Sequence, residues 1–119
     1  MYIDWLNDYS QQFLERGYLI SGETVQNRIK VIADNAERIL KRDSNQPEFF
    51  DGYSERLQSQ IAKGWISLST PIWANFGTNR GLPISCFGSY IDDSIESILS
   101  TVAESFLFNQ VCTAVFNSP

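Results

Sequence analysis

A stripe of apolar side chains at helical spacing places the strongest constraint on the fold. The stripe runs through residues 24–41, and its members follow one another at intervals of four and three: Val25, Ile29, Ile32, Ala36 and Ile39. This period gives an α-helix one apolar face, which must be buried against other elements. Thr24 or Ser21 can serve as its N-cap. The sequence therefore predicts an amphipathic helix around which a helical domain can be built.

Shorter helical patterns flank this stripe. Residues 3–16 have a short helical period, and Pro47 suits the first turn of another helix. Gly64 can end that later helix, while Gly52 weakens the prediction for its first turn. Its buried face would contain Phe50, Tyr53, Leu57 and Ile61. The pattern predicts a mainly α fold.

Charged residues on the helix over 24–41 have the spacing of intrahelical ion pairs. Asp34 with Arg38 and Glu37 with Lys41 are four residues apart, so each pair lies on one solvated face. A partner surface is the alternative interpretation. Solvated helix faces usually have this pattern, so we expect it here.

The composition excludes several classes of site. The chain of 119 residues has no histidine, which rules out Ser-His-Asp and Cys-His catalysis within it and histidine-ligated metals. Its two cysteines, Cys86 and Cys112, lack CxxC spacing, so we expect no metal site. The net charge of −5 argues against nonspecific binding to a nucleic-acid backbone.

The same composition predicts a cytoplasmic protein. Met1–Trp5 lacks the basic and apolar regions of a signal peptide. No stretch is long and apolar enough to cross a membrane. Two cysteines in an acidic chain without a leader fit a reducing compartment.

The stretch from Gly64 to Leu99 contains the unusual features. Residues 84–91 form an apolar run that predicts a buried strand, but small and polar residues interrupt it: Ser85, Cys86, Gly88 and Ser89. Such a strand leaves room for a ligand to approach its backbone. Upstream, Ser69 and Thr70 present hydroxyls just before Pro71, which breaks regular structure.

Three pieces of this stretch resemble the large (alpha) chain of ribonucleotide reductase: Ser67–Pro71, Gly81–Phe87 and Asp93–Ile95. Their order and spacing make the resemblance specific, and it ends near Glu104. It implies an N-terminal helical region over 1–82, then the first strand of a ten-stranded α/β barrel and the following helix over 83–104. Residues 105–119 would be a divergent tail, and one hypothesis is that an interruption of the gene made them foreign sequence.

The resemblance changes the interpretation of Cys86. From composition alone it would be a small buried core residue. In the family, the cysteine at this place is one of two thiols that reduce the substrate ribose and end as a disulfide. The second thiol lies far downstream in the family, and Cys112 does not match it.

Two further sets of residues acquire roles from the resemblance. Thr70 and Ser85 would contact the substrate nucleotide, whereas their alternative roles are turn and backbone-bonding hydroxyls. Asp93, Ser94 and Ile95 would help to bind the deoxynucleotide or ATP effector. The alternative is a capping box with Asp93 as N-cap and Glu96 at the third helical position.

The implied activity is reduction of ribonucleotides to deoxyribonucleotides for DNA synthesis by an allosterically controlled oxidoreductase. The complete enzyme would need the remainder of the large chain, and family members usually pair as homodimers. It would also need a radical source, either a metal-containing small subunit or adenosylcobalamin, and a dithiol reductant such as thioredoxin or glutaredoxin. The chain alone should bind no cofactor and be inactive. A noncatalytic helical module or relic is the alternative, and a free-standing nucleotide-binding domain is weaker because no glycine-rich phosphate loop is present.

Overall fold

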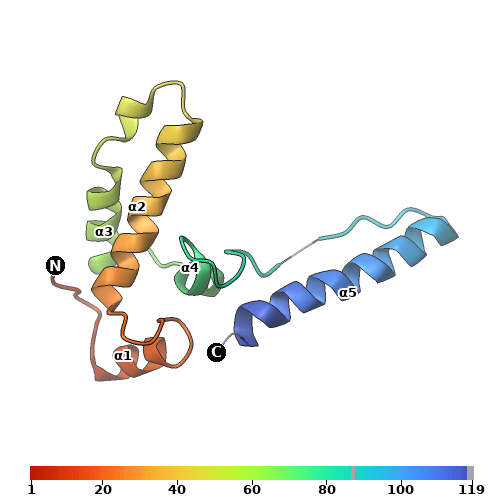
Figure 1. The fold of residues 1–119 in the computed structure, drawn as a ribbon, viewed down its shortest axis with the longest axis horizontal. Coiled ribbons are helices and arrows are strands. Elements are labelled where there is room, and N and C mark those ends of the chain that lie inside the picture. The colour runs from red at the N-terminus through yellow and green to blue at the C-terminus, as the bar shows by residue number, and fades with distance from the viewer. Residues whose placement is uncertain (87, 118–119) are drawn as a thin grey trace.

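The computed structural model describes residues 1–86 and 88–117, with side chains through Phe108. The elements in chain order are α1 (Asp8–Glu15), α2 (Val25–Asp43), the 3₁₀ helix η1 (Pro47–Phe50), α3 (Tyr53–Ala62), α4 (Thr70–Asn75) and α5 (Ile95–Asn117) (Figure 1). The predicted mainly α fold is confirmed, and the described residues contain no strand.

Helices α2 and α3 form an antiparallel hairpin and lie side by side (Figure 1). The predicted apolar stripe lies in its interface, where Ile29 of α2 and Ile61 of α3 are at most 1% exposed. Thr24 is the N-cap of α2, since its Oγ1 accepts a hydrogen bond of 3.1 Å from the Asn27 N–H. The helix predicted over 24–41 is thus confirmed, with its end at Asp43.

The connection between these helices differs from the single helix predicted after Pro47. The chain forms the short η1 and then breaks at Gly52, whose φ of 72° is left-handed. A glycine adopts this conformation without the steric cost that other residues meet, so α3 begins only at Tyr53. Gly64, with φ of 73°, follows α3 as predicted.

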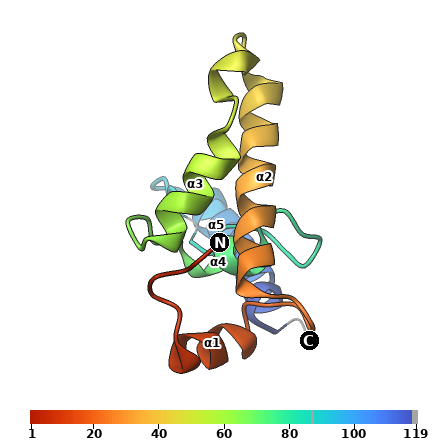
Figure 2. The ribbon, with the colours of Figure 1, turned by 90° about the vertical axis from the view of Figure 1, so that its left-hand side faces the viewer.

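The N-terminal segment closes one end of the hairpin. The Asp4 N–H donates to the Ala62 carbonyl at 2.9 Å, and Trp5 Nε1 donates to the Ile61 carbonyl at 2.7 Å. The Trp5 ring meets Trp73 of α4 edge to face, with centroids 6.0 Å apart. Figure 2 shows α1 crossing below this end of the hairpin. The first residues are therefore fixed to the end of α3 and packed against α4.

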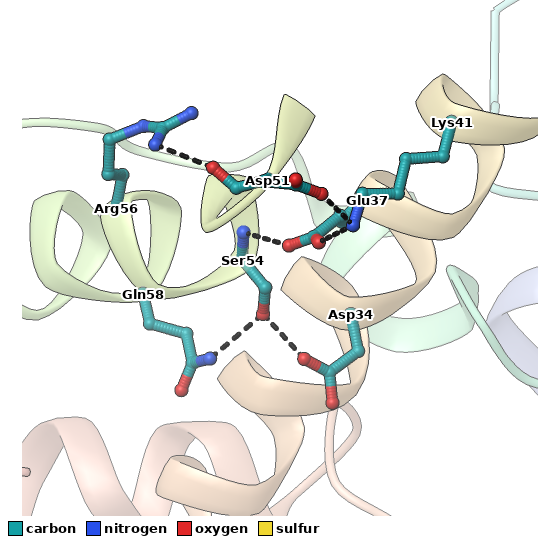
Figure 3. Close-up of polar contacts among 7 residues, drawn as sticks. All are labelled: Asp34, Glu37, Lys41, Asp51, Ser54, Arg56 and Gln58. Atoms are coloured by element: carbon teal, nitrogen blue, oxygen red, sulfur yellow. Dashed lines mark hydrogen bonds and ion pairs between the residues drawn. The ribbon is translucent and has the colours of Figure 1, made fainter. Parts of the chain in front are cut away.

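A polar network fastens the other side of the hairpin (Figure 3). Ser54 Oγ donates to Asp34 Oδ1 at 2.5 Å, and the Ser54 N–H donates to Glu37 Oε2 at 2.7 Å. Lys41 pairs with Glu37, as predicted, and also with Asp51. The predicted Asp34–Arg38 pair is wrong, because Asp34 pairs with Lys30, and Arg38 instead donates to Asn35.

The strand predicted over 84–91 is wrong in the described residues. Residues 84–86 and 88–91 are irregular and mostly exposed, while Phe87 lies outside the described residues. A strand is stabilised by hydrogen bonds to a neighbouring strand, and none is present in the part of the chain that the structure describes. An apolar run can meet the pattern of a strand without having a partner to pair with.

Helix α5 (Ile95–Asn117) runs past the predicted boundary at Glu104 without a break and turns back toward α4, which it contacts (Figure 1). The side chains beyond Phe108, including Cys112, lie outside the described ones, so the divergent tail stays a prediction. Within the described residues, no helix combines the length and apolarity that crossing a membrane requires.

Candidate substrate and effector sites

Thr70 begins α4 and lies beside the connection between α1 and α2. Its Oγ1 is 3.4 Å from the hydroxyl of Tyr18, and either oxygen can donate. Ser69 is the N-cap residue, but its side chain makes no capping hydrogen bond. Thr70 is half-buried, so its hydroxyl can be shared between Tyr18 and a ligand.

Arg28 of α2 holds the last turn of α4 from beneath. Its Nε donates to the Trp73 carbonyl at 2.6 Å, and its Nη2 donates to the carbonyls of Ile72 at 3.2 Å and Phe76 at 2.5 Å. The side chain is fully buried, and this burial lowers the pKa of Arg28, while nearby Glu23 opposes the shift. An arginine stays cationic at neutral pH, and a cation is favourable at a helix C-terminus.

The loop after α4 is fixed by Asn75. Its side-chain Nδ2 donates to the Leu82 carbonyl at 2.9 Å, and its own carbonyl accepts from the Thr78 hydroxyl at 2.8 Å. Arg80 reaches back to the carbonyls of Tyr18 and Gly17 at 3.5 and 3.4 Å. The polar loop over 77–81 is thus tied to both α4 and the α1–α2 connection.

Ser85 and Cys86 lie on the irregular segment that leaves this loop. Ser85 is half-buried, and its Oγ is 3.9 Å from the Cys86 Sγ. Cys86 is exposed and carries a free thiol. The buried position expected from composition alone is therefore wrong in this structure, and the thiol is open to approach.

The three predicted effector residues lie at the far end of the same segment, where α5 begins (Figure 1). The predicted capping box is wrong by one residue, since Ser94 precedes α5 and its Oγ accepts from the Ser97 N–H at 3.1 Å. A hydroxyl caps as well as a carboxylate, so Asp93 is not needed for this role. Asp93 and Ile95 are exposed.

The structure therefore brings some predicted residues together and separates others. Thr70 and the segment leading to Cys86 are linked through α4 and its loop, whereas Asp93–Ile95 lie away from the helical body (Figure 1). Among the described residues, no three Cys, Asp or Glu side chains gather to hold a metal ion.

Sequence reasoning missed Tyr18, Arg28 and Arg80. For Arg28 a signal was available, because it lies three residues after Val25 and one before Ile29, on the apolar stripe itself. A charged residue at a core position must be paired or hydrogen-bonded. Tyr18 and Arg80 gave no such local signal, since their contact joins residues 62 positions apart.

Comparisons with known proteins give consistent results. The chain is 46% identical over 52 residues to the ribonucleoside-diphosphate reductase large subunit of Invertebrate iridescent virus 6, covering 44% of this chain and 5% of the relative. It is 30% identical over 105 residues to the ribonucleoside-diphosphate reductase subunit alpha of Synechocystis sp., covering 86% of this chain and 13% of the relative. No family model matches.

A solved structure is similar in both fold and sequence. The Actinobacillus ureae class Id ribonucleotide reductase alpha subunit superposes with a TM-score of 0.76 and 47% identity, covering 91% of this chain and 19% of that one. The chain thus spans about a fifth or less of the length of these proteins.

Proposed function

We propose that this chain, which corresponds to part of a ribonucleotide reductase large chain, seats the ribonucleotide and supplies one of the two thiols that reduce it. The likeness to the class Id alpha subunit in sequence and fold carries this proposal. The curated relatives are named ribonucleoside-diphosphate reductases, which supports a ribonucleoside diphosphate as the substrate.

In the proposed reaction, hydrogen replaces the 2′-hydroxyl of the ribose, and the hydroxyl leaves as water. Two thiols lose their hydrogens and form a disulfide, so they supply the two electrons that the substrate gains. Cys86 is one of these thiols, and the remainder of the large chain supplies the other. The exposed Sγ supports this role, because it must be reached by the substrate, by the second thiol and by an external dithiol such as thioredoxin or glutaredoxin.

Thr70 and Ser85 are the proposed substrate contacts. A hydroxyl both donates and accepts, which suits phosphate and ribose oxygens. The contact of 3.4 Å between Thr70 Oγ1 and the Tyr18 hydroxyl is long, so a ligand can compete for Thr70. Ser85 adjoins the reactive thiol, which would place its contact close to the ribose.

Asp93, Ser94 and Ile95 are the proposed effector contacts. Ser94 caps α5, which leaves the Asp93 carboxylate to accept hydrogen bonds from a ribose hydroxyl. Their place at the far end of the segment from Cys86 supports a site distinct from that of the substrate (Figure 1).

The proposal includes partners in a cytoplasmic, reducing compartment. These are the remainder of the large chain, a second copy of the complete large chain and a radical source, either a metal-containing small subunit or adenosylcobalamin. The radical source supplies the one-electron chemistry that starts the reaction. The proposal places no metal or cofactor on this chain itself.

Complementation tests the proposal. The Actinobacillus ureae alpha subunit, lacking the part that matches this chain, is mixed with this chain and the radical source, and formation of deoxyribonucleotide is measured. We expect turnover that Cys86→Ser abolishes and Cys112→Ser leaves intact, since only Cys86 lies in the matching motif. Turnover that survives Cys86→Ser would contradict the redox role. No turnover with the unaltered chain would instead favour the noncatalytic module.

Substrate seating has its own test in the complemented enzyme. Thr70→Val keeps the shape of the side chain but removes the hydroxyl, and we expect KM to rise about tenfold, as the loss of one hydrogen bond allows. Thr101→Val is the matched control, because the Thr101 hydroxyl donates to the Ser97 carbonyl within α5. Equal KM values for the two variants would contradict a substrate contact at Thr70.

A further inference from the structure

Arg28 is a buried cation that donates hydrogen bonds to the carbonyls at the C-terminal end of α4. It is 1% exposed, and its Nε and Nη2 together donate to three carbonyls of Ile72, Trp73 and Phe76. These carbonyls close a helix of only six residues. A helix this short makes few internal hydrogen bonds, so its direction depends on groups outside it.

Asn75 continues this connection toward the reactive thiol. It is also 1% exposed, and its Nδ2 donates to the Leu82 carbonyl. Leu82 lies four residues before Cys86. An unbroken path of hydrogen bonds therefore runs from the long helix α2, through Arg28, α4 and Asn75, to the start of the segment that carries the thiol.

Core packing alone does not explain why Arg28 and Asn75 are buried here. A buried charge is costly, and replacing it with an apolar side chain of similar volume is often neutral or stabilising. Within the described part of the chain, Arg28 Nη1 and Asn75 Oδ1 have no hydrogen-bond partner, which adds to the cost. What the pair provides is a fixed direction for α4 and its loop.

We propose that Arg28 and Asn75 are positioning residues of the reduction site: they fix α4 so that Thr70 faces the substrate and the loop presents Cys86 in one place. This inference rests on the function proposed for Thr70 and Cys86. Neither residue touches the substrate, and each acts through the backbone that it holds. We expect that lysine cannot replace Arg28, because lysine lacks the planar guanidinium group that donates to three carbonyls.

Hydrogen exchange on the chain itself tests the positioning. In Arg28→Lys and in Asn75→Leu, which keeps a similar size, the amides of Phe76 and Thr78 should exchange about tenfold faster. These amides bond to the Ile72 and Asn75 carbonyls. The amide of Ile32, in the core of α2, should keep its rate. Arg42→Lys is the control, since Arg42 pairs only with exposed Asp43 among the described residues. Unchanged exchange at Phe76 and Thr78 in both variants overturns the inference.

Kinetics of the complemented enzyme tests the consequence for substrate. Arg28→Lys should raise KM about fivefold and change kcat less, and combining it with Thr70→Val should raise KM by less than the product of the single effects. Multiplicative effects, or an Arg28→Lys enzyme with unchanged KM beside a weakened Thr70→Val enzyme, overturn the inference alone. An unchanged KM in Thr70→Val overturns the proposed function first. If Arg28→Lys does not fold, Asn75→Leu serves in both measurements.

Discussion

Residues 1–82 and residues 83–108 are built in opposite ways. In the first region, the helices share a core in which Ile29 and Ala33 are 0% exposed, and hydrogen bonds join residues far apart in the chain. In the second, apolar side chains face outward, and the described hydrogen bonds join residues within five positions, as between Asp92 and Ser97. The outward-facing side chains of α5 include Ile95, Ile98, Leu99, Val102, Phe106 and Leu107.

The first region is stabilised by its own contacts, whereas the second carries most of the residues proposed to meet substrate and effector. The first region holds α4 in place from α2, so its geometry is set by its own contacts. The second region carries the proposed thiol and effector residues on a segment whose apolar groups are left open. Exposed apolar side chains in such number are typical of surfaces that bind another molecule. The proposed reduction site thus joins a half that is held by its own long-range contacts to a half whose apolar side chains are exposed.

The largest expected effect comes from the same truncation made in each region. Ile29→Ala removes buried methylene groups and leaves a cavity, so it should lower the free energy of unfolding by about 3 kcal/mol. Ile98→Ala, at a side chain 47% exposed, should change it by less than about 0.5 kcal/mol. Urea denaturation followed by circular dichroism measures both. Similar losses for the two variants would show that α5 is as tightly packed as the hairpin.

A glycine pair extends the comparison to the backbone. Gly77 has φ of 78°, and an added Cβ would lie 3.1 Å from Val31 Cγ1 on α2. Gly77→Ala should therefore cost about 1–2 kcal/mol, from the left-handed conformation and the close approach together. An added Cβ at Gly88 meets no atom within 4 Å, so Gly88→Ala should be nearly neutral. A neutral Gly77→Ala would mean that the loop after α4 can shift, against the proposed positioning.

The sequence predicted the first region better than the second, for a physical reason. Helix α2 depends on local periodicity and on a cap within three residues, both visible in the sequence around Thr24. The capping residue of α5 was predicted within one position, as Asp93 instead of Ser94. A strand depends on a neighbour that can be distant in the chain, so the apolar run over 84–91 could not establish its own structure.

For the candidate site, the sequence could suggest residues but not the contacts that hold them in place. Thr70, Ser85 and Cys86 stand in motifs that resemble a known family, so the roles proposed for them come from short stretches of sequence. The contacts of Arg28 with the Ile72–Phe76 turn join residues 44 to 48 positions apart. Long-range contacts of this kind leave only an indirect trace, here a charge among apolar residues.

Acid should weaken the hairpin through two carboxylates of the network in Figure 3. The hydrogen bond from Lys30, and then that from the Ser54 hydroxyl, lowers the pKa of Asp34, and Lys41 with the Ser54 N–H lowers the pKa of Glu37. Because both values are depressed in the folded state, the stabilisation is complete above the ordinary carboxyl pKa values. It is lost as pH falls below about 4.5, the ordinary pKa of a glutamate.

Ser54→Ala isolates one contact of this network. It should lower the free energy of unfolding by about 1 kcal/mol at neutral pH, because the hydroxyl that bonds Asp34 and Gln58 is lost. It should raise the pKa of Asp34 but not that of Glu37, whose bond comes from the backbone N–H. Carboxyl ¹³C NMR titration measures both. Ser97→Ala, on α5, is the control and should leave the pKa of Asp34 unchanged. An Asp34 pKa that is the same in both variants and in the unaltered chain would contradict the assigned network.

The smallest effect on thermal stability is expected from the largest deletion. Removing residues 83–119 deletes the exposed apolar side chains of α5 and its contact with α4, so the remaining helices should unfold at a Tm within about 2 °C of the intact chain. Removing residues 1–6 instead is the control, because it breaks the Asp4 and Trp5 hydrogen bonds to the end of α3. The decrease in Tm should be several times larger for this truncation than for removal of residues 83–119. Calorimetry of both truncated chains gives the answer. A large loss on removing 83–119 would show that α5 supports α4, and the two regions would then be one cooperative unit in which the thiol segment is held before any partner arrives.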